Sequence, residues 1–200
     1  MTLLEKLKDQ ILIADGAMGT LLYSYGTGTC FEELNLSHSE DILNIHRAYI
    51  EAGADVIQTN TYAANAYKLQ RYGLEDQVKE INRAAVKIAR EAAGHDIFVL
   101  GTIGGNRGIR PQTVPLEDII TSVREQLFVL LEEDVDGILF DTYSEYEELE
   151  NVLKIARKET DLPIITHVTL QEIGILQDRT PLNEAFERLE SLGADVVGLN

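Results

Sequence analysis

Apolar residues follow two alternating patterns along the 200 residues of this chain. Short runs rich in apolar side chains, typical of buried strands, occur at residues 11–14, 55–61, 97–102, 137–141, 163–170 and 195–200. The segments between them carry apolar residues at helical spacing, such as Val78, Ile81, Ala85, Ile88 and Ala92. The pattern predicts six strands, each separated from the next by helix.

Local signals predict where the helices begin and end. Capping-box spacing, from Thr2 to Glu5 and from Ser37 to Glu40, marks the starts of the first two helices. Glycines mark the ends of three helices, at Gly53, Gly94 and Gly193. The stretches 51–60, 133–141 and 191–200 resemble one another, each with a helix end, a turn and a strand. The repetition predicts a parallel sheet covered by helices.

Two architectures fit this alternation, a (βα)8 barrel and an open, doubly wound sheet. Neither a G-x-G-x-x-G loop nor a Walker lysine is present, so the open nucleotide-binding sheet is disfavoured. Six strands fall short of a closed barrel, which typically takes about 250 residues. The chain is therefore predicted to be an α/β protein, an incomplete TIM-type barrel of about the first six units, with residues 1–200 as its N-terminal part.

Charge and composition narrow the classes of partner. Acidic residues outnumber basic ones 34 to 17, for a formal net charge of −17. Such a chain repels phosphate backbones and anionic lipid, so we expect no nucleic-acid or membrane partner. The N-terminus has no apolar signal-peptide core, and no run is long enough to span a bilayer. The predicted location is the cytoplasm.

Residues 11–22 form the stretch around which the site is predicted. A strand ends there in Asp15, and Gly16, Ala17, Met18 and Gly19 follow. The carboxylate suits an ammonium group, and backbone N–H groups in a glycine-rich turn suit a carboxylate. This combination fits the head of an amino acid. The alternative is a simple turn in which Asp15 caps the next segment.

Other polar residues are predicted at the same rim, because the carboxyl ends of parallel strands share one edge. Asn60 and Thr61 end the second strand, and Asp141 ends the fourth. Asp15 and Asp141 together could hold an ammonium group between two carboxylates. Loop capping is the alternative for Asn60 and Thr61. Capping of the next helix is the alternative for Asp141, although Ser144 is better placed for that.

The sequence gives weaker signals for a metal site, a reactive cysteine and an anion-binding loop. The four histidines are scattered, which makes a self-contained metal site improbable. His167 could face the barrel interior, although a core position is the preferred prediction. Cys30, the only cysteine, has no basic neighbour and is predicted to be structural. Residues 104–108 form a glycine-rich loop that could cradle an anion with Arg107 and Arg110, a signal of low specificity.

Several motifs together resemble the homocysteine S-methyltransferase family. They are 15–20 (DGAMGT), 58–62 (QTNTY), 101–104 (GTIG) and 193–200 (GADVVGLN). Residues 21–26 and 30–35 look closest to one branch, the N-terminal module of the bacterial bifunctional homocysteine S-methyltransferase/5,10-methylenetetrahydrofolate reductase. The family fold is a (βα)8 barrel, and the resemblance covers essentially the whole chain.

The resemblance implies roles for the predicted site. Asp15 and the backbone of Gly16 and Ala17 would hold the amino and carboxylate groups of homocysteine. Asp141 falls where the family usually has a glutamate facing the same ammonium. Because an aspartate is one methylene shorter, we expect its contact to run through a bridging water.

The resemblance also implies a zinc ion, which in this family is held by three cysteines and activates the thiol. The first cysteine follows the G-x-N pattern seen here at 198–200, and the other two lie near the last strand. Cys30 and the dispersed histidines cannot replace them, so no metal ligand or catalytic residue is assigned to this chain. We expect it to be inactive alone. FAD would be present only if a reductase module follows.

The expected partners are homocysteine and a methyl donor. The donor stays open among methylfolate, S-methylmethionine and S-adenosylmethionine. Open strand edges predict self-association. Two alternatives remain: a non-catalytic amino-acid-binding or scaffold domain, and a different barrel enzyme such as an aldolase or decarboxylase. The latter lacks a strand-end lysine for Schiff-base chemistry.

Overall fold

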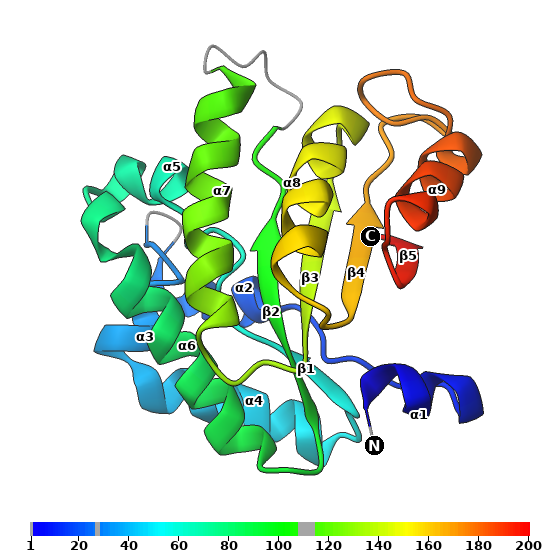
Figure 1. The fold of residues 1–200 in the computed structure, drawn as a ribbon. Coiled ribbons are helices and arrows are strands. Elements are labelled where there is room, and N and C mark those ends of the chain that lie inside the picture. Colours follow the sequence, from blue (N-terminus) through cyan, green and yellow to red (C-terminus); the bar gives the residue numbers. More distant parts are fainter. Residues whose placement is uncertain (1, 27–28, 108–114) are drawn as a thin grey trace.

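A parallel sheet with its strands in chain order forms the centre of the protein (Figure 1). The computed structural model describes residues 2–26, 29–107 and 115–200. Within them the strands are β1 (Val56–Gln58), β2 (Phe98–Gly104), β3 (Gly137–Tyr143), β4 (Ile164–Val168) and β5 (Val196–Leu199). A doubly wound sheet would reverse its strand order, so the sequential order selects the barrel-type alternative.

The long helices lie side by side along one face of this sheet (Figure 1). In chain order they are α4 (Ser39–Glu51), α6 (Val78–Ala93), α7 (Leu116–Leu131), α8 (Tyr146–Glu159) and α9 (Leu182–Ser191). Shorter pieces join them: α2 (Met18–Leu21), α3 (Leu34–Ser37), α5 (Ala66–Leu69) and the 3-10 turns η1 (Leu22–Tyr25), η2 (Gln70–Tyr72) and η3 (Glu75–Gln77). These shorter pieces were not expected from the sequence. No helix among the described residues is long and apolar enough to cross a bilayer.

The core divides between the two faces of the sheet because strand side chains alternate. Ile57, Val99 and Ile138 point toward the helices and are fully buried in the main cluster. Their neighbours Val56, Leu100 and Leu139 point to the other face. There they pack against Leu3, from α1 (Leu3–Asp9). Helix α1 opens with the predicted capping box between Thr2 and Glu5.

The repeated stretches noted in the sequence share one structural role. Each places an aspartate just before or at the start of a strand, where its Oδ2 accepts a backbone N–H of the preceding segment in the sheet. Asp55 accepts from Ile13 at 3.0 Å. Asp136 and Asp195 accept from Val99 and Ile164 at 2.7 and 2.8 Å. The repetition therefore fixes the register at the amino edge of the sheet.

The prediction of a buried strand at 11–14 is wrong in part. Only Ala14 forms a bridge, with Val56, and the Ile13 carbonyl accepts the N–H groups of Asp55 and Val56. Among the described residues the segment has sheet contacts on this side alone, so Ile11 and Ile13 are 91% and 61% exposed. The bridge between Ala14 and Val56 is parallel, as expected for this sheet.

The start of the second helix also differs from the prediction. Ser37 ends α3, and α4 begins at Ser39 with His38 at its N-cap. The Ser37 hydroxyl donates to the Glu33 carboxylate at 2.9 Å, so it is not free to cap α4.

Candidate functional site

A cavity of about 530 Å³ lies at the carboxyl edge of the sheet. Five of the six predicted binding residues line it, namely Asp15, Gly16, Ala17, Asn60 and Asp141. Further walls come from other strand ends and loops, including Glu32, Gln58, Tyr62, Thr102, His167 and Asn200. The structure therefore brings together side chains that lie up to 185 positions apart, from Asp15 to Asn200.

Asp15 is a partly buried carboxylate with neutral partners. Its Oδ2 accepts the backbone N–H of Gln58 at 2.9 Å, and its Oδ1 accepts the Gln58 side-chain amide at 3.1 Å. Burial raises the pKa of Asp15 to about 6, although these hydrogen bonds act in the opposite direction. Within the described residues no cation pairs with it. It is not a simple helix cap, because Ala17, which has no capping side chain, stands at the start of α2.

The backbone of Gly16 and Ala17 lines the cavity. Their N–H groups have no acceptor recorded among the described residues, whereas the Ala17 carbonyl accepts the Tyr49 hydroxyl at 3.1 Å. A Cβ at position 16 would lie 2.9 Å from that hydroxyl oxygen, so the close approach of Tyr49 requires glycine. Both residues are exposed and line the cavity, and backbone N–H groups in such a turn can donate to an anion.

Asn60 lines the cavity, but its side-chain N–H groups hold the protein together. They donate to the Phe31 carbonyl at 2.8 Å and to the Asn35 side chain at 3.1 Å. Thr61 does not join the other predicted residues. Its side chain is fully buried and donates to the Thr102 carbonyl at 2.6 Å, so the prediction that places it at the cavity is wrong.

Asp141 faces the same cavity as Asp15, as predicted, but with different partners. Its Oδ1 accepts the Asn200 amide at 3.0 Å, and its Oδ2 accepts the Thr142 hydroxyl at 3.1 Å. His167 Nδ1 lies 3.3 Å from Oδ1. The carboxylate is thus surrounded by donors of the chain itself. His167 is 32% exposed and lines the cavity, so its prediction as a core residue is wrong.

The Asp141 region carries backbone strain. Thr142 has φ of 58°, a conformation that is costly for a β-branched residue. Its carbonyl oxygen would lie 2.6 Å from a Cβ at position 105, so Gly105 is needed for the backbones to meet. Strain of this kind, of order 1–3 kcal/mol, persists where surrounding contacts impose it and is frequent at functional sites.

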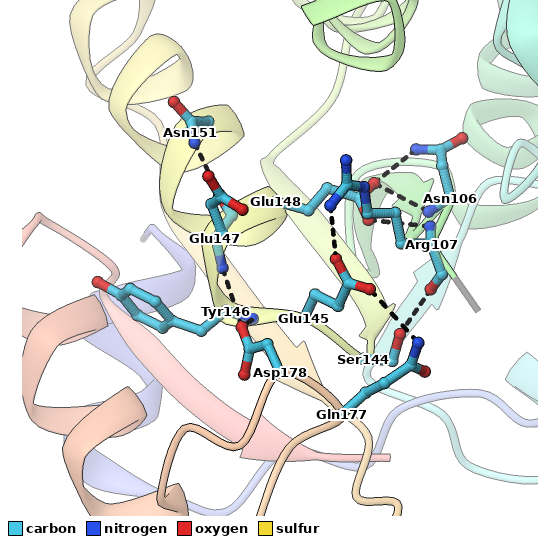
Figure 2. A network of polar contacts seen from close by, with 10 residues as sticks. All are labelled: Asn106, Arg107, Ser144, Glu145, Tyr146, Glu147, Glu148, Asn151, Gln177 and Asp178. Carbon is cyan, nitrogen blue, oxygen red and sulfur yellow. Dashed lines mark hydrogen bonds and ion pairs between the residues drawn. The ribbon is translucent and has the colours of Figure 1, made fainter. Parts of the chain in front are cut away.

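The loop after β2 is fastened to α8 by a buried carboxylate (Figure 2). Glu148, fully buried, accepts the backbone N–H groups of Asn106 and Arg107 at 2.9 and 3.0 Å and the Asn106 side-chain amide at 2.9 Å. Arg107 also pairs with Glu145 at 2.9 Å. The N–H groups of Asn106 and Arg107 are therefore occupied, which weakens the predicted anion cradle; Gly108 and Arg110 lie outside the described residues.

Cys30 is structural, as predicted. It is buried among Ala64, Leu69, Val78 and Ile81 and does not itself line the cavity. Burial and the nearby Glu32 carboxylate raise the pKa of its thiol to about 11. A thiol in this environment stays protonated at neutral pH.

Three wall residues were given no role by sequence reasoning. Gln58 holds Asp15, Glu32 accepts the Ala63 N–H at 2.8 Å, and the ring of Tyr62 covers Gly104. Gln58 was detectable, because it belongs to the same 58–62 motif as Asn60. Strand alternation could not have shown this, because the chain bends at Asn60, where the Thr61 N–H donates to the Thr59 carbonyl at 2.8 Å.

Comparison with known proteins shows which family the chain resembles. The family model for homocysteine S-methyltransferase matches residues 12–200. Methionine synthase from Mycobacterium leprae (strain TN) is 29% identical over 220 residues, which cover 99% of this chain and 18% of that protein. Betaine–homocysteine S-methyltransferase 1 from Xenopus tropicalis is 30% identical over 207 residues, which cover 99% of this chain and 51% of that protein. The chain thus spans about half of the length of these relatives, or less.

The fold also matches a solved structure. The metallated form of the homocysteine methyltransferase MmuM from Escherichia coli aligns with a TM-score of 0.84 at 23% identity, over 98% of this chain and 76% of that one. At this identity the likeness concerns the fold. It confirms the predicted α/β class with an incomplete TIM-type barrel.

Proposed function

Because the chain belongs to the homocysteine S-methyltransferase family, we propose that residues 1–200 form the homocysteine-binding part of such a methyltransferase. In this proposal the cavity at the carboxyl edge of the sheet receives the amino-acid head of homocysteine. The parent enzyme transfers a methyl group to the thiol of homocysteine and releases methionine.

The observation that carries the proposal is that the Asp15 carboxylate is partly buried with no cation beside it in the described residues. A carboxylate that is partly buried beside an open cavity, with neutral donors and a pKa raised to about 6, gains from the arrival of a cation. The ammonium group of an amino acid supplies that cation. The positioning contact is the pair of Gln58 hydrogen bonds, which orient the carboxylate without neutralising it.

In this proposal the carboxylate of homocysteine is bound by backbone N–H groups. The N–H groups of Gly16 and Ala17 donate to the carboxylate of homocysteine. Asp141 has its oxygens engaged by Asn200, Thr142 and the neighbouring His167, so it reaches the ammonium through a water. Asn60 shapes the wall by fixing Phe31 and Asn35, and the buried Thr61 has no part in binding the ligand in this proposal.

The residues present do not fit the zinc ion that the family implies. Cys30 is the only cysteine of the chain, and it is buried with a raised pKa. Among the described residues no three His, Cys, Asp or Glu side chains are grouped to hold a metal. We therefore derive no step through zinc, and propose that thiol activation depends on residues outside this chain.

Three expectations from the sequence concern the wider context of this chain. A reductase module with FAD, a cytoplasmic location and self-association through open strand edges all stay predictions. The alternative function is a non-catalytic amino-acid-binding or scaffold domain, favoured by the lack of a metal-ligand group in the described residues.

Calorimetry and an activity assay test the proposal on the same sample. The chain is expected to bind homocysteine, with or without added zinc, and to form no methionine from any of the three donors. Tight binding of about one zinc per chain would contradict the proposed division of the site. Absence of homocysteine binding would refute the proposed function.

A further inference from the structure

A second cavity, of about 420 Å³, adjoins the first and has no role in the proposed function. Glu32 and Tyr62 line both cavities, so the two share a wall. The outer side of the second cavity comes from α5 and η2, which contribute Lys68 and Arg71. Tyr67 and Tyr72 also line it, so the second cavity combines cations with aromatic rings.

Lys68 stands at the boundary between the cavities. Its ammonium donates to the carbonyl oxygens of Gly104 and Tyr62 at 3.2 and 3.3 Å and lies 4.2 Å from the centroid of the Tyr62 ring. These partners are neutral. Burial lowers the pKa of Lys68 to about 8, and Arg71 contributes to the lowering because the two like charges are close.

Neither cation has a direct counter-ion among the described residues. Three carboxylates act on Lys68 from a distance, those of Glu32, Glu148 and Asp141. Each is engaged elsewhere: Glu32 with the Ala63 N–H, Glu148 with the loop at 106–107, and Asp141 with Asn200. Among the described residues of the cavity lining, Glu32 is the one carboxylate and Lys68 and Arg71 are the two cations.

Two unpaired cations in one cavity are notable in a chain whose net charge is −17. Lys68 is half-buried and Arg71 lies at the exposed rim, and like charges held close together repel each other unless an anion joins them. Asn106, which also lines this cavity, is held by Glu148 (Figure 2) and accepts the side-chain amide of Asn65, the N-cap of α5, at 3.0 Å. The cavity thus places two cations that have no direct ion pair among the described residues next to the site proposed for homocysteine.

We infer that the Lys68–Arg71 cavity binds an anionic group of the methyl donor, with a ring of the donor lying against the tyrosines. The inference rests on the proposed function and specifies the chemical class of the second substrate. A donor with carboxylates and a ring fits this lining. A small sulfonium donor brings a positive charge toward Lys68 and Arg71 and has no ring for the tyrosines.

The test uses the full chain and two probes, 5-methyltetrahydrofolate and S-methylmethionine. Lys68→Met and Arg71→Gln are each expected to weaken 5-methyltetrahydrofolate binding about tenfold, since each removes a charge-assisted contact. Lys79→Met, on an exposed position of α6 outside both cavities, is the matched control and leaves the affinity unchanged. Higher salt is expected to weaken binding to the wild type and to Lys79→Met alike.

Homocysteine affinity, measured on the same samples, separates this inference from the proposed function. The inference predicts that both variants keep wild-type affinity for homocysteine. Unchanged 5-methyltetrahydrofolate affinity in both variants, no binding of it by the wild type, or preferred binding of S-methylmethionine would each overturn the inference. If Lys68→Met fails to fold, Arg71→Gln at the exposed rim decides the outcome.

Discussion

Gln58 donates two hydrogen bonds to the carboxylate of Asp15, from its backbone N–H at 2.9 Å and from its side-chain amide at 3.1 Å. Both donors are neutral, so they fix the position of the carboxylate without balancing its charge. The cost of burial exceeds their stabilisation, and the pKa of Asp15 rises to about 6. A ligand that brings a positive charge would offset the free-energy cost of burying the ionised carboxylate.

The affinity for homocysteine is expected to increase with pH up to neutrality. Asp15 must be ionised to accept the ammonium group, and its pKa is about 6 in the free protein. At about one pH unit below that value only about a tenth of the carboxylate is ionised, so affinity falls about tenfold. Calorimetric titration across this range measures the effect. Asp15→Asn should give weak binding with a flat profile, and a variant that keeps the wild-type slope would assign the titration to another group.

Asp15→Asn is also expected to stabilise the folded protein at neutral pH. The folded pKa lies above the ordinary value of 3.8, so the contribution of Asp15 is favourable below about pH 3.8 and is lost as pH rises through about 6. Removing the carboxylate should raise the free energy of unfolding by about 1–2 kcal/mol at neutral pH. Urea denaturation of both proteins measures this, and the gain should vanish in acid.

Asp55→Asn is the control for this substitution, because the pKa of Asp55 is lowered whereas that of Asp15 is raised. The Ile13 N–H and Lys6 lower the pKa of Asp55, so its contribution is present above the ordinary pKa and is lost in acid. This variant is therefore expected to be less stable than the wild type at neutral pH. Stabilisation by both substitutions would indicate a general effect of removing negative charge from an acidic chain.

Much of the fold could be predicted from the sequence because its signals are local. Helix α6 follows the spacing of its apolar residues, and the repeated aspartates mark the starts of strands. The segment at 11–14 misled the prediction because apolar composition reports the tendency to be buried, whereas burial depends on a neighbour. Ile11 and Ile13 have no covering element among the described residues.

His46 is expected to make the protein acid-sensitive. Its ring is fully buried, and neither nitrogen has a hydrogen-bond partner among the described residues. Burial lowers its pKa to about 4. The unfolded chain takes up a proton first as pH falls below about 6.5, so stability is full above that pH and declines toward pH 4, by about 3 kcal/mol in total.

The His46→Leu variant isolates this contribution. Its free energy of unfolding, compared with that of the wild type from pH 7 to pH 4, should lack the same decline, because leucine does not titrate. A wild-type curve that parallels the variant would show that protonation of another group governs the acid range.

Gly105→Ala is expected to destabilise the protein by about 1–3 kcal/mol. The new methyl group would lie 2.6 Å from the Thr142 carbonyl oxygen, and backbone must move to admit it. Gly19→Ala is the matched control, because its nearest neighbour would be the Phe31 ring at 3.7 Å, an ordinary contact. Thermal unfolding of the pair measures the difference, and equal stability of the two variants would contradict the close approach.

The site was less predictable than the fold because pairing decides what each polar residue can do. Asp15 and Asp141 have the same side chain and face one cavity, yet Asp15 has only the Gln58 donors while Asp141 is engaged by Asn200, Thr142 and His167. No local pattern distinguishes them. Lys68 and Arg71 could likewise be interpreted only once the fold placed them at one cavity with Tyr62, without a direct ion pair among the described residues.

The most direct test of the account compares homocysteine with 4-mercaptobutanoate, the analogue that lacks only the amino group. Binding of both compounds to the wild type and to Asp15→Asn forms a double-mutant cycle. If Asp15 holds the ammonium, the wild type prefers homocysteine by about tenfold or more and the variant binds the two compounds equally. An undiminished preference in Asp15→Asn would place the amino group elsewhere and contradict the account.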